Sequence, residues 1–257
     1  MTIDHTDPRS PSQQIADDLR EQINGGTFAP GDPLPSERNL VDRYGTAPQT
    51  TRQAIAILKA EGLVIGKPGR GIFVRERLPI VRVGSDTRAQ WRERKGQSPM
   101  QAEAEANDLS WYQEVLALET VPAPDWVADR LAISTGEDVF VRRRRTWIES
   151  VPTQVVDSYY RLGDVEGTRI MSEDTGPGGS YAQLEERGLT LARFREEIGI
   201  RMPTPEEARQ LRLGPGIPVA EMYRVAFTES RPVEVFRAVL SGNSHKFVYE
   251  FDAPRLT

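Results

Sequence analysis

The sequence predicts two domains, a winged helix-turn-helix followed by an α+β domain with an antiparallel sheet. The first domain is indicated by two capped helices, a tight turn and a glycine-tipped hairpin, all between Leu34 and Val74. The second is indicated by helical and β-rich segments that alternate irregularly along the rest of the chain. With 257 residues the chain is long enough to form both cores.

The first helix of the small domain comes from the segment PSQQIADDLREQINGG. Ile15, Leu19 and Ile23 recur every four residues, which places them on one apolar face of a helix. Gly25 and Gly26 follow directly and are typical of a helix end. The residues before this segment, 1–9, are expected to form a disordered tail.

The second and third helices are marked by their boundaries. Ser36 is a natural N-cap, because its hydroxyl can accept a hydrogen bond from a free backbone N–H, and Gly45 ends the second helix. The third helix begins near Thr46 or Ala47, with Pro48 in its first turn, where a missing N–H costs nothing. Its apolar residues recur at helical spacing and are expected to face the core.

The segment LVIGKPGRGIFV predicts two short strands joined by a turn. Gly69 and Gly71 flank Arg70 in that turn, and small residues let a hairpin tip approach another molecule closely. Gly-x-Gly alone indicates only a turn. Its place between two β-rich runs after the third helix favours a wing.

The segments QQIADDLREQINGGTFAPGDPLPSERNLVDRYG, TTRQAIAILKAEGLV and GRGIFV resemble the DNA-binding domain of GntR-family transcription regulators. The resemblance covers roughly residues 10 to 76. It implies a third helix that lies in the major groove of double-stranded DNA. The contacts it implies are Ser36, Arg38, Thr46, Gln49, Thr50, Arg52, Lys67, Gly69, Arg70 and Gly71.

The start of the third helix departs from the family pattern. Where relatives carry Ser-Arg, this chain has Ala47 and Pro48, so one arginine contact to phosphate or guanine is missing. Arginine suits such contacts because its planar fork can bond both major-groove acceptors of a guanine. Two alternatives remain open: Arg38 could form an ordinary surface ion pair, and Arg52 could bridge helices.

The composition limits the class of protein. The net charge of −5 would argue against a nucleic-acid binder if it were spread evenly, but recognition depends on where the basic groups lie. The absence of cysteine excludes disulfides and thiolate metal sites and is typical of a reducing cytoplasm. We expect a cytoplasmic location and no membrane contact, since no segment approaches about 18 apolar residues and no signal peptide precedes the first helix.

The second domain is expected after a linker at residues 77–95. The segments EVLALETVPAP, DVFVRRRRTWI and PTQVVDSYYRL predict strands, the last two joined by a turn from Glu149 to Val151. DWVADRLAI, SYAQLEERG and TPEEARQLRL predict helices, the last capped by Thr204. PVAEMYRVAFTESRPVEVFRAVLSG and HKFVYEFDA predict the closing strands.

The arginine-rich strand, PTQVVDSYY, GPGIPVAEMYRVAF and FVYEFDA resemble the UTRA effector-binding domain of the HutC subfamily of GntR regulators, over roughly residues 96 to 252. The resemblance implies a chorismate-lyase-like fold that dimerises. It also implies a small intracellular effector, often anionic, such as a sugar phosphate, a phosphonate or a carboxylate.

Within the arginine-rich strand, side chains alternate between the two faces of the sheet. Arg142 and Arg144 therefore share one face and Arg143 and Arg145 the other, and only one pair can line a pocket. A solvated strand face is the alternative for either pair. The resemblance assigns effector contacts to Arg142, Arg144, Tyr159 and Glu234. Core packing is the alternative for Tyr159 and equally for its neighbour Tyr160, and a structural ion pair is the alternative for Glu234.

The predicted function is a DNA-binding transcription regulator. We expect a homodimer that represses from an inverted-repeat operator and is released by a small metabolite. Two alternatives are an enzyme with a chorismate-lyase-like domain and a DNA-binding protein without an effector. Because the only histidines are His5 and His245, no histidine metal cluster or Ser-His-acid triad is available. No catalytic residue, cofactor or metal is therefore assigned.

Overall fold

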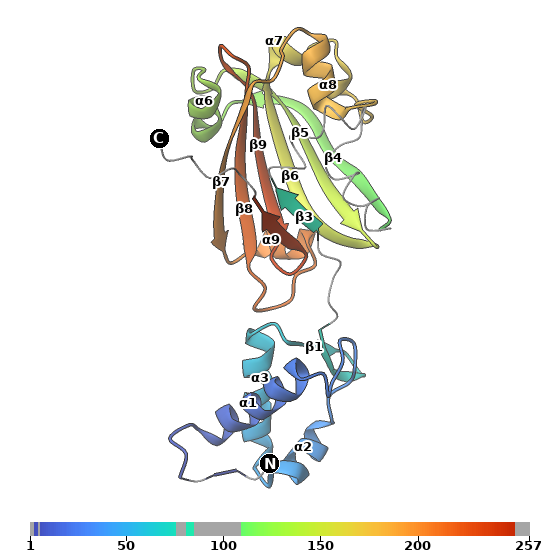
Figure 1. Ribbon diagram of the computed structural model, residues 1–257, viewed down its shortest axis with the longest axis vertical. Coiled ribbons are helices and arrows are strands. Elements are labelled where there is room, and N and C mark those ends of the chain that lie inside the picture. Colours follow the sequence, from blue (N-terminus) through green and yellow to red (C-terminus); the bar gives the residue numbers. More distant parts are fainter. Residues whose placement is uncertain (1–2, 5, 76–80, 85–108, 250–257) are drawn as a thin grey trace, which may run out of the picture. The chain divides into compact units, whose positions relative to one another are not determined.

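The computed structural model describes residues 3–4, 6–75, 81–84 and 109–249. Most of the predicted linker, residues 77–95, lies outside these ranges. The chain divides into two compact units, drawn in Figure 1: Met1–Leu78 with Leu213–Ile217, and Pro79–Arg212 with Pro218–Thr257.

The first unit holds three helices and a two-stranded hairpin. The bounds are α1 Pro11–Asn24, α2 Glu37–Tyr44, α3 Pro48–Ala60, β1 Val64–Lys67 and β2 Gly71–Val74. The Ser36 hydroxyl accepts a hydrogen bond from the backbone N–H of Asn39, and Gly45 ends α2 with a φ of 64°. This left-handed conformation favours glycine and makes room for the sharp turn into α3.

The core of this unit lies between the three helices and the hairpin. Leu19 of α1, Leu40 of α2 and Leu58 of α3 are fully buried in one cluster, to which Val64 and Val74 of the hairpin also belong. The apolar periodicity of the sequence thus accounts for the packing, since each helix turns its one apolar stripe inward.

Ile3 and Asp4 contact this unit, although the sequence predicts a disordered tail at residues 1–9. Ile3 is 8% exposed and belongs to the core cluster. The buried Gln14 accepts a hydrogen bond from the Asp4 backbone N–H at 3.0 Å and donates to the Asp4 carbonyl at 2.9 Å. A buried amide must be paired, and Gln14 meets this requirement through the main chain of Asp4.

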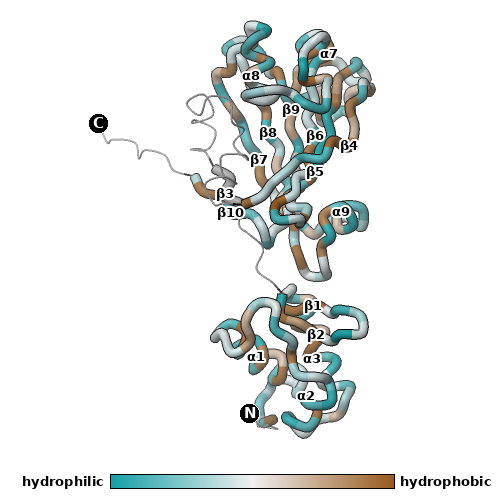
Figure 2. Tube along the Cα trace, turned by 90° about the vertical axis from the view of Figure 1, so that its right-hand side faces the viewer, coloured by the Kyte–Doolittle hydropathy of each residue, from teal (hydrophilic) through white to brown (hydrophobic). Residues whose placement is uncertain are grey.

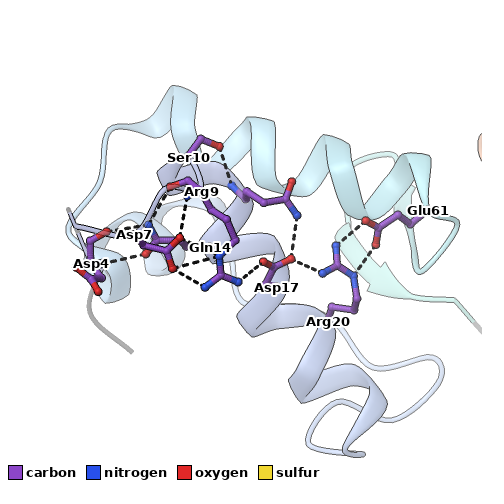
Figure 3. A network of polar contacts seen from close by, with 9 residues as sticks. Asp4, Asp7, Arg9, Ser10, Gln14, Asp17, Arg20 and Glu61 are labelled. Atoms are coloured by element: carbon purple, nitrogen blue, oxygen red, sulfur yellow. Dashed lines mark hydrogen bonds and ion pairs between the residues drawn. The ribbon is translucent and has the colours of Figure 1, made fainter.

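A polar network on α1 joins this helix to the end of α3 (Figure 3). Arg20 bonds Asp17 on its own helix and Glu61 just past α3. Arg9 bonds Asp17 as well, at 2.7 Å. The arginines of this side of the unit are therefore neutralised by carboxylates.

The second unit is built on a six-stranded antiparallel sheet with strand order β4-β5-β6-β9-β8-β7. The strands are β4 Trp111–Pro122, β5 Asp138–Ile148, β6 Val151–Arg161, β7 Arg193–Arg201, β8 Val219–Phe227 and β9 Pro232–Ser241. A separate parallel pair is formed by β3 Val81–Gly84 and β10 His245–Val248. The α+β class and the antiparallel sheet predicted from the sequence are confirmed.

Helices cover the two faces of this sheet. They are α6 Asp125–Leu131, α7 Leu162–Val165, η1 Arg169–Met171, α8 Gly179–Glu186 and α9 Pro205–Gln210. On one face α6 packs on Tyr159 and Val235. On the other, η1 and α8 pack on Phe140 and Tyr160. Figure 1 shows α7 and α8 together at one end of the sheet and α9 at the other.

Hydrophobic and hydrophilic stretches are mixed along the strands, as Figure 2 shows, and helices cover both faces of the sheet. The turn predicted between β5 and β6 is present, with Glu149 and Ser150 at φ 48° and 65°. The sequence analysis did not anticipate β7, α7 or η1. β7 is an edge strand rich in charge, so its hydrophobic signal is weak.

Within the described ranges, no helix is both long enough and apolar enough to cross a membrane.

Candidate DNA-binding face and effector site

None of the residues predicted to contact DNA is buried. They lie at the start of α2, on the first half of α3 and at the tip of the hairpin. The exposed ones are Ser36, Arg38, Gln49, Arg52, Gly69, Arg70 and Gly71, and those partly exposed are Thr46, Thr50 and Lys67.

Arg38 and Arg52 differ in their surroundings. Arg38 is exposed and forms no hydrogen bond or ion pair with any residue that the structure describes. The Nε of Arg52 lies 3.0 Å from Oε1 of Glu37, and the two side chains are 58% and 45% exposed. The ion pair proposed as an alternative for Arg38 is therefore not present in the described structure. Arg52 bridges α3 and α2 through Glu37, which is the alternative stated for Arg52.

The start of α3 shows what the departure from the family pattern changes. Ala47 is the N-cap and offers no side-chain acceptor, and Pro48 occupies the first turn. The hydroxyl of Thr46 lies 3.3 Å from that of the buried Thr51. Thr46 therefore contacts a core residue of α3 with its hydroxyl.

The hairpin tip carries two cations held over one ring. Lys67 pairs with Gly71 across the hairpin. Its Nζ lies 4.7 Å from the centre of the Phe73 ring, and Cζ of Arg70 lies 5.8 Å from it. Cation–π contacts of this kind restrain flexible side chains. Gly69 has a φ of 69°, which only glycine adopts without strain.

Charge is distributed unevenly in the first unit. From Ser36 to Gly71 the sequence has six basic and three acidic residues. On α1, by contrast, Arg20 is held between two carboxylates (Figure 3). The positive charge available to a polyanion therefore lies on α2, α3 and the hairpin, which answers the objection raised by the net charge of −5.

The second candidate site lies on the sheet of the other unit, where the four arginines of β5 alternate. Arg143 contacts Glu119 at 2.7 Å and Asp157 at 3.7 Å. Arg145 contacts Glu114 at 2.8 Å. One pair of arginines is thus neutralised by carboxylates on its own face.

Arg142 and Arg144 lie on the opposite face, and neither forms an ion pair within the described part of the chain. Arg142 is 4% exposed. It donates to three main-chain carbonyls after α7, those of Ile170 at 3.3 Å, Glu173 at 2.6 Å and Ser172. Burial, and then the positive charge of Arg144, lower the pKa of Arg142 to about 10. It remains charged at neutral pH without an anionic partner.

Strand register gathers further polar side chains around this pair. Arg142 of β5 lies opposite Ser158 of β6, Ser158 opposite Phe236 of β9, and Phe236 opposite Arg224 of β8. Residues in such a row share a face. The Nη2 of Arg144 donates to the Ser158 hydroxyl at 2.6 Å.

The next row adds an acid and a phenol. Glu234 is 2% exposed, and its Oε1 accepts a hydrogen bond from the Tyr160 hydroxyl at 2.8 Å. Burial raises the pKa of Tyr160, so the phenol is a donor at neutral pH. We define the polar cluster as Arg142, Arg144, Ser158, Tyr160, Arg224 and Glu234.

Several atoms of the polar cluster are buried without a partner among the described residues. They are Nε of Arg142, of Arg144 and of Arg224, and Oε2 of Glu234. Buried polar atoms are normally paired, so a group of unpaired donors and one acceptor on a single sheet face is suited to a polar ligand.

The prediction for Tyr159 places it on the wrong face. Its ring packs edge to face on Trp126 of α6, with centroids 5.3 Å apart, on the side opposite Arg142. Its neighbour Tyr160 occupies the predicted place. Sequence reasoning also missed Ser158 and Arg224. Because side chains alternate along a strand, the sequence of β6 shows that Ser158 and Tyr160 share a face. It does not show which strands lie beside β6.

Comparison with known proteins places the chain in a family. Residues 11–74 match the model for bacterial regulatory proteins of the gntR family, and residues 109–246 match the UTRA domain. The HTH-type transcriptional regulator SCO4628 of Streptomyces coelicolor is 34% identical over 96% of this chain and 95% of its own length. This chain belongs to the GntR family. It is a DNA-binding transcription regulator with a UTRA domain, and not an enzyme.

Two further proteins resemble this GntR-family chain. The mannosyl-D-glycerate transport/metabolism system repressor MngR of Escherichia coli is 26% identical over 91% of this chain and 93% of its own length. The crystal structure of PhnF from Mycobacterium smegmatis superposes with a TM-score of 0.59, covering 93% of this chain and all of PhnF at 22% identity. The second likeness shows the same two-domain fold.

Proposed function

We propose that this GntR-family regulator is a repressor that binds an inverted-repeat operator as a homodimer and releases it when a small anionic metabolite occupies the polar cluster. Residues 10–76 would bind DNA, and residues 96–252 would hold the effector and the dimer contacts. A linker at residues 77–95 would join these two domains, and a tail at residues 1–9 would precede the first. The protein would act in the cytoplasm. The observation that carries the proposal is the pair of the buried Arg142 and the partly buried Arg144, which has no carboxylate partner in the described structure.

The DNA-binding half of the proposal rests on exposure and charge. Arg52 and Gln49 on α3 and Arg38 at the start of α2 are exposed. Arg52 and Gln49 would read base edges, and Arg38 would contact phosphate. Arg70 and Lys67 give the wing two cations for a neighbouring groove. The remaining contacts proposed from the sequence, Ser36, Thr46, Thr50, Gly69 and Gly71, support these through backbone and hydroxyl groups.

The anionic nature of the effector follows from charge balance. A buried and a partly buried guanidinium group on one face are costly unless an anion neutralises them, and their forks bind phosphate or carboxylate at two points. The free Oε2 of Glu234 would accept a hydrogen bond from a ligand hydroxyl. An anion that also carries hydroxyls, such as a sugar phosphate or a sugar acid, satisfies both requirements. MngR, the repressor of a mannosyl-D-glycerate system, supports this class of ligand.

A homodimer is proposed because a single winged helix contacts few base pairs. Two copies related by a two-fold axis would place their α3 helices on the two halves of an inverted repeat. The effector would bind more tightly to a conformation in which the two α3 helices are wrongly spaced for the operator. It can lower DNA affinity only by as much as it prefers that conformation. A tenfold loss of affinity requires about 1.4 kcal/mol of coupling.

The proposal is tested by thermal unfolding of the full chain with a panel of sugar phosphates, phosphonates and sugar acids. We expect at least one compound to raise the melting temperature of the wild type and of Arg143→Ala, but not of Arg144→Ala. Arg143→Ala is the matched control, because it removes the same charge from the other face of β5. If the compound stabilises Arg144→Ala equally well, the effector does not bind at the polar cluster.

A further inference from the structure

We propose that Glu37 positions Arg52 for base reading: its carboxylate forms an ion pair on the Nε side of Arg52, so that the two terminal nitrogens of the guanidinium are presented to a guanine. Glu37 would then set the sequence specificity of this regulator without touching DNA. The inference rests on the proposed DNA contact of Arg52.

The geometry of the pair carries the first step. Glu37 is the first residue of α2, and Arg52 lies in the second turn of α3. The Nε of Arg52 is 3.0 Å from Oε1 of Glu37 and 3.5 Å from the backbone carbonyl of Pro48. Both contacts are made by Nε. Within the described residues, Nη1 and Nη2 of Arg52 have no acceptor.

The second step is the hydrogen-bond chemistry of guanine. A guanidinium can offer two parallel N–H groups either from its side, Nε with one Nη, or from its end, Nη1 with Nη2. Guanine presents O6 and N7 as neighbouring acceptors in the major groove. The one N–H of Nε donates to the Pro48 carbonyl, and Glu37 lies against the same nitrogen, so only the end of the Arg52 fork is free for this contact.

The third step is charge. A carboxylate beside Arg52 offsets part of its positive charge, which weakens its attraction to phosphate more than its hydrogen bonds to a base edge. The next residue, Arg38, has no such partner among the residues that the structure describes. The two arginines are therefore prepared for different contacts, Arg38 for the backbone and Arg52 for a base.

Stability does not account for the pair. Its side chains are 58% and 45% exposed, and ion pairs this exposed contribute little to folding. The exposed pair instead lies on the side of the unit where the proposed DNA contacts gather. The lost arginine at Pro48 makes the orientation of Arg52 more important, since fewer arginines remain to read bases.

The test uses the full chain and a duplex selected from a random-sequence library by the wild type. Each guanine of that duplex is replaced in turn by 7-deazaguanine, which lacks the N7 acceptor. We expect wild-type affinity to fall about tenfold at one guanine in each half-site, and Arg52→Ala to be insensitive to that replacement.

Glu37→Ala is expected to lose most of this sensitivity while its affinity for random duplex rises. Glu37→Gln, which keeps the size of the side chain and an oxygen beside Nε but removes the charge, should restore part of the sensitivity. Asp42→Ala is the matched control, because it removes the same charge from the same helix without a contact to Arg52 in the described structure. It should raise affinity for random duplex and keep full sensitivity.

Glu37→Ala with wild-type sensitivity, or with a loss that Asp42→Ala reproduces, would overturn the positioning role while leaving the Arg52 contact in place. If no sequence is selected, or if Arg52→Ala keeps the 7-deazaguanine penalty, the proposed contact fails and the positioning role fails with it.

Discussion

Arg142 and Arg143 are neighbours in β5 but have opposite kinds of partner. Arg143 contacts the carboxylate of Glu119 at 2.7 Å, whereas Arg142 donates only to main-chain carbonyls in the described structure. Alternation along the strand places the two on opposite faces of the sheet. On the face of Arg143 the positive charge is neutralised by a carboxylate. On the face of Arg142 a buried positive charge remains that a ligand can neutralise.

Tyr160 and Tyr159 should respond differently to loss of their hydroxyls. Tyr160→Phe removes the donor to the buried Glu234, which then has no partner on either oxygen in the described structure. We expect a loss of about 1 to 3 kcal/mol in the free energy of unfolding and weaker metabolite binding. Tyr159→Phe is the control on the opposite face. The measurement is urea unfolding of both variants. A larger loss in the free energy of unfolding for Tyr159→Phe than for Tyr160→Phe would contradict the placement of Tyr160 in the polar cluster.

A charged network next to α9 should make stability depend on pH. Hydrogen bonds from Arg201 lower the pKa values of Glu207 and Glu221 to about 2. A carboxyl whose pKa is lowered by folding stabilises the protein above its unfolded pKa, and this contribution is lost as pH falls through the folded pKa. The window therefore runs from the ordinary value of 4.5 down to about 2.

The variant that tests this is Glu207→Gln. After allowance for solvent screening, we expect it to lower the free energy of unfolding by about 1 to 2 kcal/mol at pH 7, and the difference from wild type to shrink below pH 4.5. Glu206→Gln, a change to an exposed neighbour on the same helix, is the control and should have little effect. A Glu207→Gln deficit that stayed constant down to pH 2 would assign the effect to packing rather than charge.

Arg52 and Lys67 should differ in how they affect DNA binding. Arg52→Ala is expected to cost about 1 to 3 kcal/mol on the selected duplex and to relax sequence preference. Lys67→Ala should weaken binding to all sequences alike and reduce the dependence on salt by about one counterion. Titrations at several salt concentrations on selected and random duplexes separate the two. Equal losses on both duplexes for Arg52→Ala would exclude base reading.

Local rules predict much of this fold. The helix caps at Ser36 and Gly45 and the turn at Glu149 and Ser150 depend on residue types a few positions apart, and the structure has them where the sequence places them. The separation of Arg142 from Arg143 follows from strand alternation alone.

The sequence alone does not predict which strands lie side by side when they are far apart in the chain. The sequence does not distinguish Tyr159 from Tyr160, because a shift of one residue exchanges the two faces of a strand and only the neighbouring strands show which face holds the site. Arg224 joins the polar cluster through the register of β8 with β9. The pairing of Glu37 with Arg52 joins two helices and has no periodic signal.

The most direct test of the account is a fluorescence-anisotropy titration of the stabilising metabolite into the complex of the full chain with its selected duplex. We predict that the metabolite releases DNA from the wild type and from Arg143→Ala, and that Arg144→Ala binds the duplex normally but does not release it. Undiminished release from Arg144→Ala would contradict control of DNA binding through the polar cluster.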